Sequence, residues 1–265
     1  MKMISDTHLH SAFSCDSNTP PRENAESAES QNIKTIAFTE HYDCYLGGRP
    51  TDDFDGDAYF EDILALKDEF AGRVGILTGI EIGMQPPAVI LEQSAKRIEG
   101  LTLDHVVGSM HYVSGLDIYD GSYFNGKDKR ESYTVLLRET LECLKKYTFV
   151  DTLGHIDYSS RYAPYEDRQL RYREFPDEFD ELFRFIIENG LSLEFNTKTA
   201  GRVPPDPDVW TRYKELGGEL VTFASDAHKP WLVGYEFEKH TAFLKNLGYK
   251  FAFRYENRKP VAEEL

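Results

Sequence analysis

The chain has 265 residues, of which 40% are hydrophobic and 29% are charged, as is ordinary for a soluble globular protein. Its formal net charge of -16 repels nucleic-acid phosphates and no basic stripe offsets it, which excludes long nucleic acids as partners. A small phosphate ester is not excluded, because a bound divalent cation can reverse the sign of the local field.

The three cysteines, Cys15, Cys44 and Cys143, show no CxxC spacing, so neither a disulfide framework nor a zinc ribbon is expected. The first residues lack the apolar stretch of a signal peptide, and no later run is long enough to cross a membrane. We therefore expect a cytoplasmic protein in a reducing compartment. The sequence does not indicate its oligomeric state.

Short apolar segments alternate with amphipathic ones about seven times, which is typical of βα units around a parallel sheet. The predicted strands span 3–8, 35–39, 75–81, 105–110, 149–154, 192–196 and 220–225. The predicted helices span 21–30, 58–70, 87–98, 130–146, 176–189, 206–216 and 234–247. The alternation predicts one α/β domain over residues 1–265.

Three predicted connections are longer than a minimal βα loop: residues 43–57, 112–129 and 158–175. In parallel barrels the loops that follow the strands surround the active site. These segments are therefore candidates for a substrate pocket.

Most of the histidines follow predicted strands, and two carboxylates occupy equivalent points. The histidines are His8, His10, His41, His111, His155 and His228, and the carboxylates are Glu81 and Asp226. Because the carboxyl ends of parallel strands converge, these separate positions are expected to form one pocket. Histidine is the commonest metal ligand, so the sequence predicts a metalloenzyme.

Side chains two residues apart in a strand share a face, so His8 and His10 can point to one place, as can Asp226 and His228. Asp6 lies on the same face one step deeper and is expected to orient a liganding histidine. Glu81 is a charged residue in an apolar strand, a costly position unless the carboxylate is coordinated. It is a candidate to bridge two metals.

Taken singly, a histidine at a strand end is more often a hydrogen-bonded structural residue than a ligand, and only the combined set favours a metal site. His105 and His240 keep the structural interpretation, because His105 begins a strand at the far end and His240 lies within a helix. The acidic pairs at 52–53 and 263–264 are interpreted as solvated surface.

Six motifs follow one another in a fixed order: Asp6-x-His8-x-His10, Thr39-Glu40-His41, Gly79-x-Glu81, Ser109-Met110-His111, Gly154-His155-Ile156-Asp157 and Ser225-Asp226-x-His228. In these blocks the chain resembles the PHP family over residues 3–230. Three further segments resemble its histidinol-phosphatase branch: 14–17, 119–121 and 161–165.

The resemblance implies a distorted (β/α)7 TIM-like barrel, the PHP fold, with two or three divalent ions of Zn, Mn or Fe. Three ligand sets are implied: His8, His10, Glu81 and Asp226 for the first metal; Glu81, His111 and His155 for the second; Asp16, His41 and His228 for the third. Glu81 would bridge. Composition does not distinguish Zn from Mn or Fe in such mixed sites.

The activity implied is hydrolysis of L-histidinol phosphate to L-histidinol and phosphate, in histidine biosynthesis, by a metal-bridging hydroxide. Arg161 matches the family arginine that binds the substrate phosphate. Lys198 stands where the branch usually has arginine, and Arg202 is the alternative anion contact. Either Asp226 or His228 could assist as the general acid, and the sequence does not choose between them.

Two alternatives remain at this stage. The first is another PHP phosphoesterase, acting on nucleotides, short oligonucleotides or phosphotyrosine. The second is a non-catalytic metal-binding barrel, which would lack the open coordination position that an enzyme needs.

Overall fold

The computed structural model describes residues 4–43 and 54–265, and its main sheet has nine strands in the order β1-β2-β3-β4-β7-β8-β9-β10-β11. The first seven of these run parallel to one another. They are β1 (Asp6–Leu9), β2 (Thr35–Asp43), β3 (Gly75–Gly83), β4 (His105–Ser109), β7 (Thr152–Leu153), β8 (Ser192–Asn196) and β9 (Val221–Ala224). The parallel α/β architecture expected from the sequence is confirmed.

The parallel part of the sheet curves until its first and last strands, β1 and β9, meet at the carboxyl side. There Leu9, at the end of β1, forms a parallel bridge with Ala227, just beyond β9. The Asp226 amide donates to the His8 carbonyl at 2.9 Å, and the His10 amide donates to the Ala227 carbonyl at 2.8 Å. The barrel is distorted because β9 also pairs with β10, at Phe253 and Thr222.

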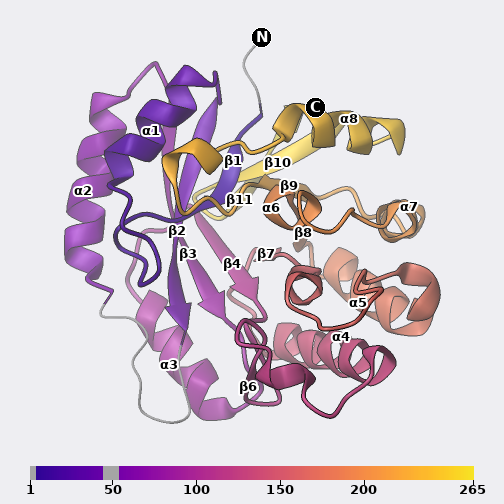
Figure 1. The fold of residues 1–265 in the computed structure, drawn as a ribbon. Helices are drawn as coiled ribbons and strands as arrows, with labels where there is room; N and C mark the ends of the chain where they lie inside the picture. The colour runs from indigo at the N-terminus through magenta and orange to yellow at the C-terminus, as the bar shows by residue number, and fades with distance from the viewer. Residues whose placement is uncertain (1–3, 44–53) are drawn as a thin grey trace.

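Helices follow one another around the outside of the sheet, from indigo α1 through magenta α4 to yellow α8 (Figure 1). They are α1 (Pro21–Ser30), α2 (Gly56–Glu69), α3 (Ala88–Ile98), α4 (Lys129–Lys146), α5 (Pro176–Glu188), α6 (Thr197–Ala200), α7 (Pro207–Glu215) and α8 (Phe237–Asn246). Seven of these were predicted, and the one-turn helix α6 was not.

Local sequence explains why these helices begin where they do and which face they bury. Asp128 caps α4 by accepting from the Glu131 amide, and Pro176 occupies the first turn of α5, where its missing N–H costs nothing. Helix α5 buries Phe179, Leu182, Phe183 and Ile186, a 3–4 spacing that turns one apolar stripe inward.

Two hairpins were not predicted. The C-terminal one joins β10 (Phe251–Glu256) to β11 (Lys259–Glu264) through Asn257 and Arg258, both at positive φ. A two-residue turn with both central φ angles positive usually contains glycine, so its absence hid the turn. The short hairpin of β5 (Tyr112–Val113) and β6 (Leu116–Asp117) lies inside the predicted loop 112–129.

The predicted strand 149–154 is shorter in the structure, where only Thr152–Leu153 pairs. Most of the predicted loop 43–57, together with Cys44, the pair 52–53 and the first residue of the strand 3–8, lies outside the described residues. The described helices include none apolar and long enough to span a bilayer. The expected cytoplasmic location stays a prediction.

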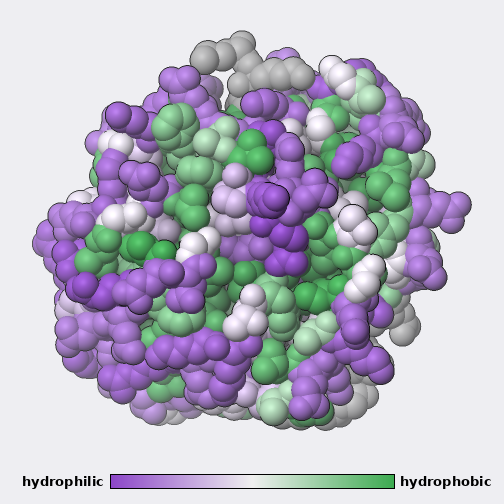
Figure 2. All heavy atoms as spheres, turned by 180° about the vertical axis from the view of Figure 1, so that it is seen from behind, coloured by the Kyte–Doolittle hydropathy of each residue, from purple (hydrophilic) through white to green (hydrophobic). Residues whose placement is uncertain are grey.

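Hydrophilic side chains cover most of the face opposite to the view of Figure 1, with hydrophobic ones interspersed through its middle (Figure 2). This fits the chain's large excess of acidic over basic residues.

Candidate metal centre

The structure brings all the sequence-predicted ligands together at the carboxyl ends of the parallel strands. Among the residues that the structure describes, four overlapping sets have three ligand atoms within 4.8 Å of one another. The sets are His8, His10 and Asp226; His8, Glu81 and His155; His41, Glu81 and His111; and His10, His41 and His228. Asp16 joins the last set through His228 and His41.

Glu81 lies at the centre of the cluster, in β3 and fully buried. Its Oε1 lies 2.8 Å from Nε2 of His155 and 3.3 Å from Nε2 of His111. Its Oε2 lies 3.3 Å from Nε2 of His8 and 3.5 Å from Nε2 of His10. Each carboxylate oxygen thus faces a different group of histidines, Oε2 also approaching His41, which is the arrangement required of a bridging ligand.

Several atoms of the cluster that could bind a metal lack hydrogen bonds. Oε2 of Glu81, Nδ1 of His41 and Nδ1 of His155 are buried without a hydrogen-bond partner. His41 Nδ1 and Glu81 Oε2 are 2.9 Å apart, but their geometry is not that of a hydrogen bond. Buried unsatisfied polar atoms are costly and call for an explanation. A cation between Oε2 of Glu81 and Nδ1 of His41 provides one for these two atoms, so the residues fit a divalent metal.

Asp16 and His228 form the most exposed part of the cluster. Asp16 Oδ2 lies 2.8 Å from Nε2 of His228, and Oδ1 lies 3.6 Å from Nε2 of His41. The Asp16 side chain is 51% exposed, in the loop between β1 and α1. This third group of ligand atoms therefore faces the solvent side of the site.

Carboxylates behind the cluster orient its histidines. Nδ1 of His8 lies 2.8 Å from Oε2 of Glu194, and Nδ1 of His111 lies 2.9 Å from Oδ1 of Asp43. Each contact directs the opposite ring nitrogen, Nε2, toward Glu81. Such contacts fix the tautomer and raise ligand basicity. Sequence reasoning missed this role for Glu194 and Asp43.

His10 is oriented through a relay instead. Its Nδ1 lies 3.0 Å from Oγ of Ser14, and that hydroxyl donates to Oε2 of Glu40 at 2.5 Å. Glu40 is fully buried and also accepts from the Ser11 amide. The signal that could have revealed Glu40 and Glu194 is the one used for Glu81, an acidic residue inside an apolar strand.

The orienting role predicted for Asp6 is wrong. Its carboxylate accepts from the Ser225 amide and hydroxyl at 2.9 and 2.5 Å and from the Gly234 amide at 2.9 Å. Burial raises the pKa of Asp6 to about 6 despite these bonds. Asp6 therefore fastens the strand end before Asp226 and contacts no liganding imidazole through its side chain.

Asp226 is held in place from several sides. Its backbone has a φ of +50°, a left-handed conformation that stores strain in a residue other than glycine. Its Oδ1 lies 3.1 Å from Nζ of Lys198, and its Oδ2 accepts from Arg161 at 3.1 Å. Burial opposes the charged carboxylate, but these two cations outweigh it and hold its pKa well below the usual range.

Glu81 is also kept ionised. Burial disfavours its charged form, but His8, His111 and His41 outweigh that effect and hold the pKa of Glu81 well below its ordinary value. For His10, burial lowers the imidazole pKa well below its ordinary value, with help from His41 and His228. Metal binding requires an ionised carboxylate and neutral imidazoles. Although burial disfavours their charged forms, the carboxylates around His8, His41 and His111 raise the pKa of these three rings, so each would have to lose a proton when a metal binds.

The three candidate anion contacts occupy different depths. Arg161 is buried, with Nε donating to Oγ1 of Thr199 at 2.6 Å and Nη2 to Oδ1 of Asn196 at 2.8 Å. Burial lowers the pKa of Lys198, and its Nζ lies 3.2 Å from Nδ1 of His228. Arg202 is exposed at the rim. All three line the same cavity.

That cavity has a volume of about 800 Å³, within the range of small-ligand sites. Two of the predicted loops supply its walls, with Tyr112, Asp117 and Tyr119 from one and Tyr158 and Tyr162 from the other. Segments 112–129 and 158–175 therefore do line this cavity, and their role in binding a substrate stays a prediction.

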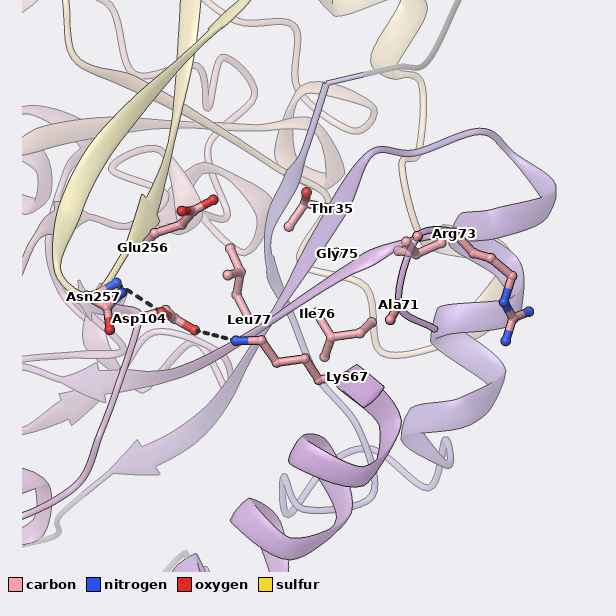
Figure 3. A pocket seen from close by; sticks show the side chains of 12 residues that line it. Thr35, Lys67, Ala71, Arg73, Gly75, Ile76, Leu77, Asp104, Glu256 and Asn257 are labelled. Atoms are coloured by element: carbon pink, nitrogen blue, oxygen red, sulfur yellow. Dashed lines mark hydrogen bonds and ion pairs between the residues drawn. The ribbon is translucent and has the colours of Figure 1, made fainter. Parts of the chain in front are cut away.

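A second pocket, of about 470 Å³, opens at the amino ends of β2 and β3 (Figure 3). There Asp104 accepts from the Asn257 amide at 2.9 Å and faces Lys67 at 4.0 Å. Of the described residues that line it, none is a histidine or a cysteine. Barrel active sites lie at the carboxyl end, so we assign no chemistry to this pocket.

His105 and His240 lie outside the centre, as predicted. His105 packs against Tyr255 with ring centroids 4.8 Å apart, and its Nε2 lies 2.7 Å from Oγ1 of Thr152. His240 of α8 contacts Glu236, the residue just before that helix, at 3.1 Å. The other six histidines converge on Glu81 and Asp226.

Residues 6–198 match the PHP domain family. The chain belongs to that family. It is 33% identical to the "Probable histidinol-phosphatase" of Clostridium acetobutylicum, covering 95% of this chain and 96% of that protein. It is 30% identical to the histidinol-phosphatase of Lactococcus lactis, covering 92% of this chain and 91% of that protein.

A solved structure is also similar over nearly the whole chain. The histidinol phosphate phosphatase of Lactococcus lactis, complexed with zinc, L-histidinol and phosphate, superposes with a TM-score of 0.89 at 27% identity, covering 98% of this chain and 99% of that one. The distorted α/β barrel expected for the PHP family is thereby confirmed.

Proposed function

We propose that this protein hydrolyses L-histidinol phosphate to L-histidinol and phosphate, as a step of histidine biosynthesis. The observation that carries the proposal is the cluster around Glu81 and Asp226, which opens directly into a cavity lined by Arg161, Lys198 and Arg202. The chain is similar to histidinol-phosphatases over more than nine-tenths of its length, which supports L-histidinol phosphate as the substrate.

Two or three divalent ions, of Zn, Mn or Fe, are the proposed cofactors. His8, His10, Glu81 and Asp226 would hold the first; Glu81, His111 and His155 the second; and Asp16, His41 and His228 the third. Such ions lower the pKa of a bound water and neutralise charge on phosphoryl oxygens.

The chain's own residues prepare the site for an anion. Glu194 and Asp43 fix imidazole rings, while Asp226 holds Lys198 and Arg161 beside the cavity. Charge-assisted donors of this kind bind phosphate oxygens strongly. Hydrolysis then breaks the ester P–O bond, with the oxygen of water going to phosphorus and a proton going to the alcohol oxygen.

The test is a steady-state comparison of L-histidinol phosphate with phenyl phosphate, phosphotyrosine, a nucleoside monophosphate and a short oligonucleotide. We expect kcat/KM for L-histidinol phosphate to exceed each of the others by about 100-fold. Turnover no better than that of phenyl phosphate would reject the substrate. Elemental analysis showing fewer than two transition-metal equivalents in active protein would reject a multinuclear centre.

A further inference from the structure

A small internal cavity adjoins the metal centre at His155. It lies between Leu136 and Thr140 of α4 and the turn that carries His155 and Ser159, the latter in η2 (Tyr158–Arg161). Its volume is about 10 Å³, close to the least that one water molecule needs. The cavity therefore has room for a single water and for no larger molecule.

Polar atoms without partners gather around this cavity. In the described part of the chain, Nδ1 of His155 and Oγ of Ser159 are buried and have no hydrogen-bond partner, and both residues line the cavity. A third such atom, Oγ of Ser109, lies beside Gly154, which also lines the cavity; a Cβ at Gly154 would come within 2.2 Å of that hydroxyl. Buried unsatisfied polar atoms are rare and costly. Three of them beside one cavity indicate a shared polar partner.

Nδ1 of His155 needs an acceptor because the other ring nitrogen belongs to the metal cluster. Nε2 lies 2.8 Å from Oε1 of Glu81. An imidazole that binds a metal through Nε2 carries its hydrogen on Nδ1, and ligating histidines almost always donate that hydrogen to a carboxylate, a backbone carbonyl or a water. Glu194 occupies this position for His8, whereas no described group accepts from Nδ1 of His155.

We propose that this cavity binds one water molecule, which accepts the hydrogen of His155 Nδ1 and bonds to the hydroxyls of Ser159 and Ser109. This inference rests on the metal centre of the proposed function and not on its substrate. Three partners are the usual number for a buried water. Ser159 and Ser109 are then positioning residues, which act on the metal through the water and the imidazole.

The water gives the second metal site an orienting group of a different kind from its neighbour. His111, also a proposed ligand of the second metal, lies 2.9 Å from the carboxylate of Asp43. A bond to an ionised group is roughly twice as strong as one to a neutral group, so the water holds His155 less firmly than Asp43 holds His111. Loss of the water should therefore weaken the second site and spare the first, whose proposed ligands do not include His155.

The test measures zinc binding by full-length protein, through competition with a chelating dye and elemental analysis. Ser159→Val fills the cavity with apolar atoms and should raise the free zinc concentration needed to load the second site about 10- to 100-fold. Ser159→Ala leaves room for the water but removes one of its partners, and should raise that concentration about 3- to 10-fold. A crystal structure of the zinc-loaded wild type should show a water about 2.7 to 3.2 Å from Nδ1 of His155.

Ser94→Val is the matched control. Ser94 is also a buried serine whose hydroxyl has no partner among the described residues, but it lies on α3, outside this cavity. Its variant should bind zinc as wild type does. Equal losses in Ser94→Val and Ser159→Val would mean a general structural effect and would overturn the water site.

The crystal structure provides a second way to reject the proposal. A dry cavity in the zinc-loaded wild type, or a Ser159 hydroxyl bonded directly to Nδ1 of His155, would overturn the water site. Wild-type protein that binds no zinc would instead reject the metal centre and the proposed function with it. Zinc binding that is unchanged in both Ser159 variants rejects the water site alone.

Discussion

Oε2 of Glu194 lies 2.8 Å from Nδ1 of His8, and this contact turns Nε2 of the same ring toward Glu81 and His10. Both side chains are fully buried. Oε1 of Glu194 also accepts from the side-chain amide, Nδ2, of Asn196 at 2.9 Å. The carboxylate is therefore fixed on one side by β8 and fixes the imidazole on the other.

Glu194→Gln should weaken metal binding about 10- to 100-fold, because an amide orients the His8 ring less strongly and makes it a weaker ligand. The measurement is activity as a function of added metal after dialysis, with elemental analysis of the same samples. Excess metal should restore most of kcat. The matched control is Glu188→Gln, the same change at an exposed position, which should behave as wild type. Equal metal affinity in the two variants would contradict the orienting role.

The sequence predicted the ligands better than the groups that orient them. His8, Glu81 and Asp226 follow from strand-end positions, and the parallel sheet brings them together because carboxyl ends converge. Glu40 and Glu194 have the same sequence context as Glu81, an acid in an apolar strand. Only the register of the sheet shows that Glu81 faces the cluster while the other two stand behind histidines.

The hairpins were missed for a local reason. In the C-terminal hairpin, Asn257 and Arg258 adopt positive φ without the glycine that a sequence reader uses to recognise a tight turn. The other hairpin does turn at Ser114 and Gly115, both at positive φ, but each of its strands is only two residues long. Asp6 was misjudged because period-two alternation predicts which face of the strand a side chain lies on. It does not predict how far along the strand that side chain lies from the metal cluster. The barrel closure near Asp226 places Ser225 within reach of Asp6 before any imidazole.

Removal of metal should destabilise the folded protein. The donor atoms around Glu81 are buried, and a ligand that binds only the folded state stabilises it by about 2.7 kcal/mol at 100 times its Kd. Thermal unfolding should therefore shift to lower temperature with a chelator and return when Zn or Mn is added. Glu81→Gln should lose most of this metal-dependent shift. A midpoint unaffected by chelator in wild type would argue against metal between these residues.

The anion contacts can be separated by their response to inorganic phosphate. Lys198→Ala should raise the inhibition constant of phosphate about 10- to 100-fold, because Nζ lies beside Asp226 inside the cavity and a charged donor contributes strongly to anion binding. Arg202→Ala should have a smaller effect, since Arg202 is exposed at the rim. Lys198→Arg should retain most of the affinity. A larger loss in Arg202→Ala than in Lys198→Ala would reverse the assignment.

His105 should make the fold sensitive to acid independently of the metal centre. Burial lowers the pKa of this imidazole to about 4, from an ordinary value of 6.5. In its neutral form Nδ1–H donates to the Thr7 carbonyl at 3.1 Å and Nε2 accepts from the Thr152 hydroxyl at 2.7 Å. Protonation would turn Nε2 into a donor, so the Thr152 hydroxyl would have to accept instead of donating, and it would leave a buried positive charge.

The direction of the pH effect follows from where the proton binds. Above about pH 6.5 the imidazole is neutral in both states, and as the pH falls toward 4 only the unfolded chain takes up the proton, so stability is lost. His105→Gln removes this group. Between about pH 7 and pH 4 the free energy of unfolding should fall less in this variant than in wild type, by up to about 3 kcal/mol. Chemical denaturation in excess chelator measures this without metal release. Parallel pH profiles for the two proteins would show that His105 does not titrate with a lowered pKa.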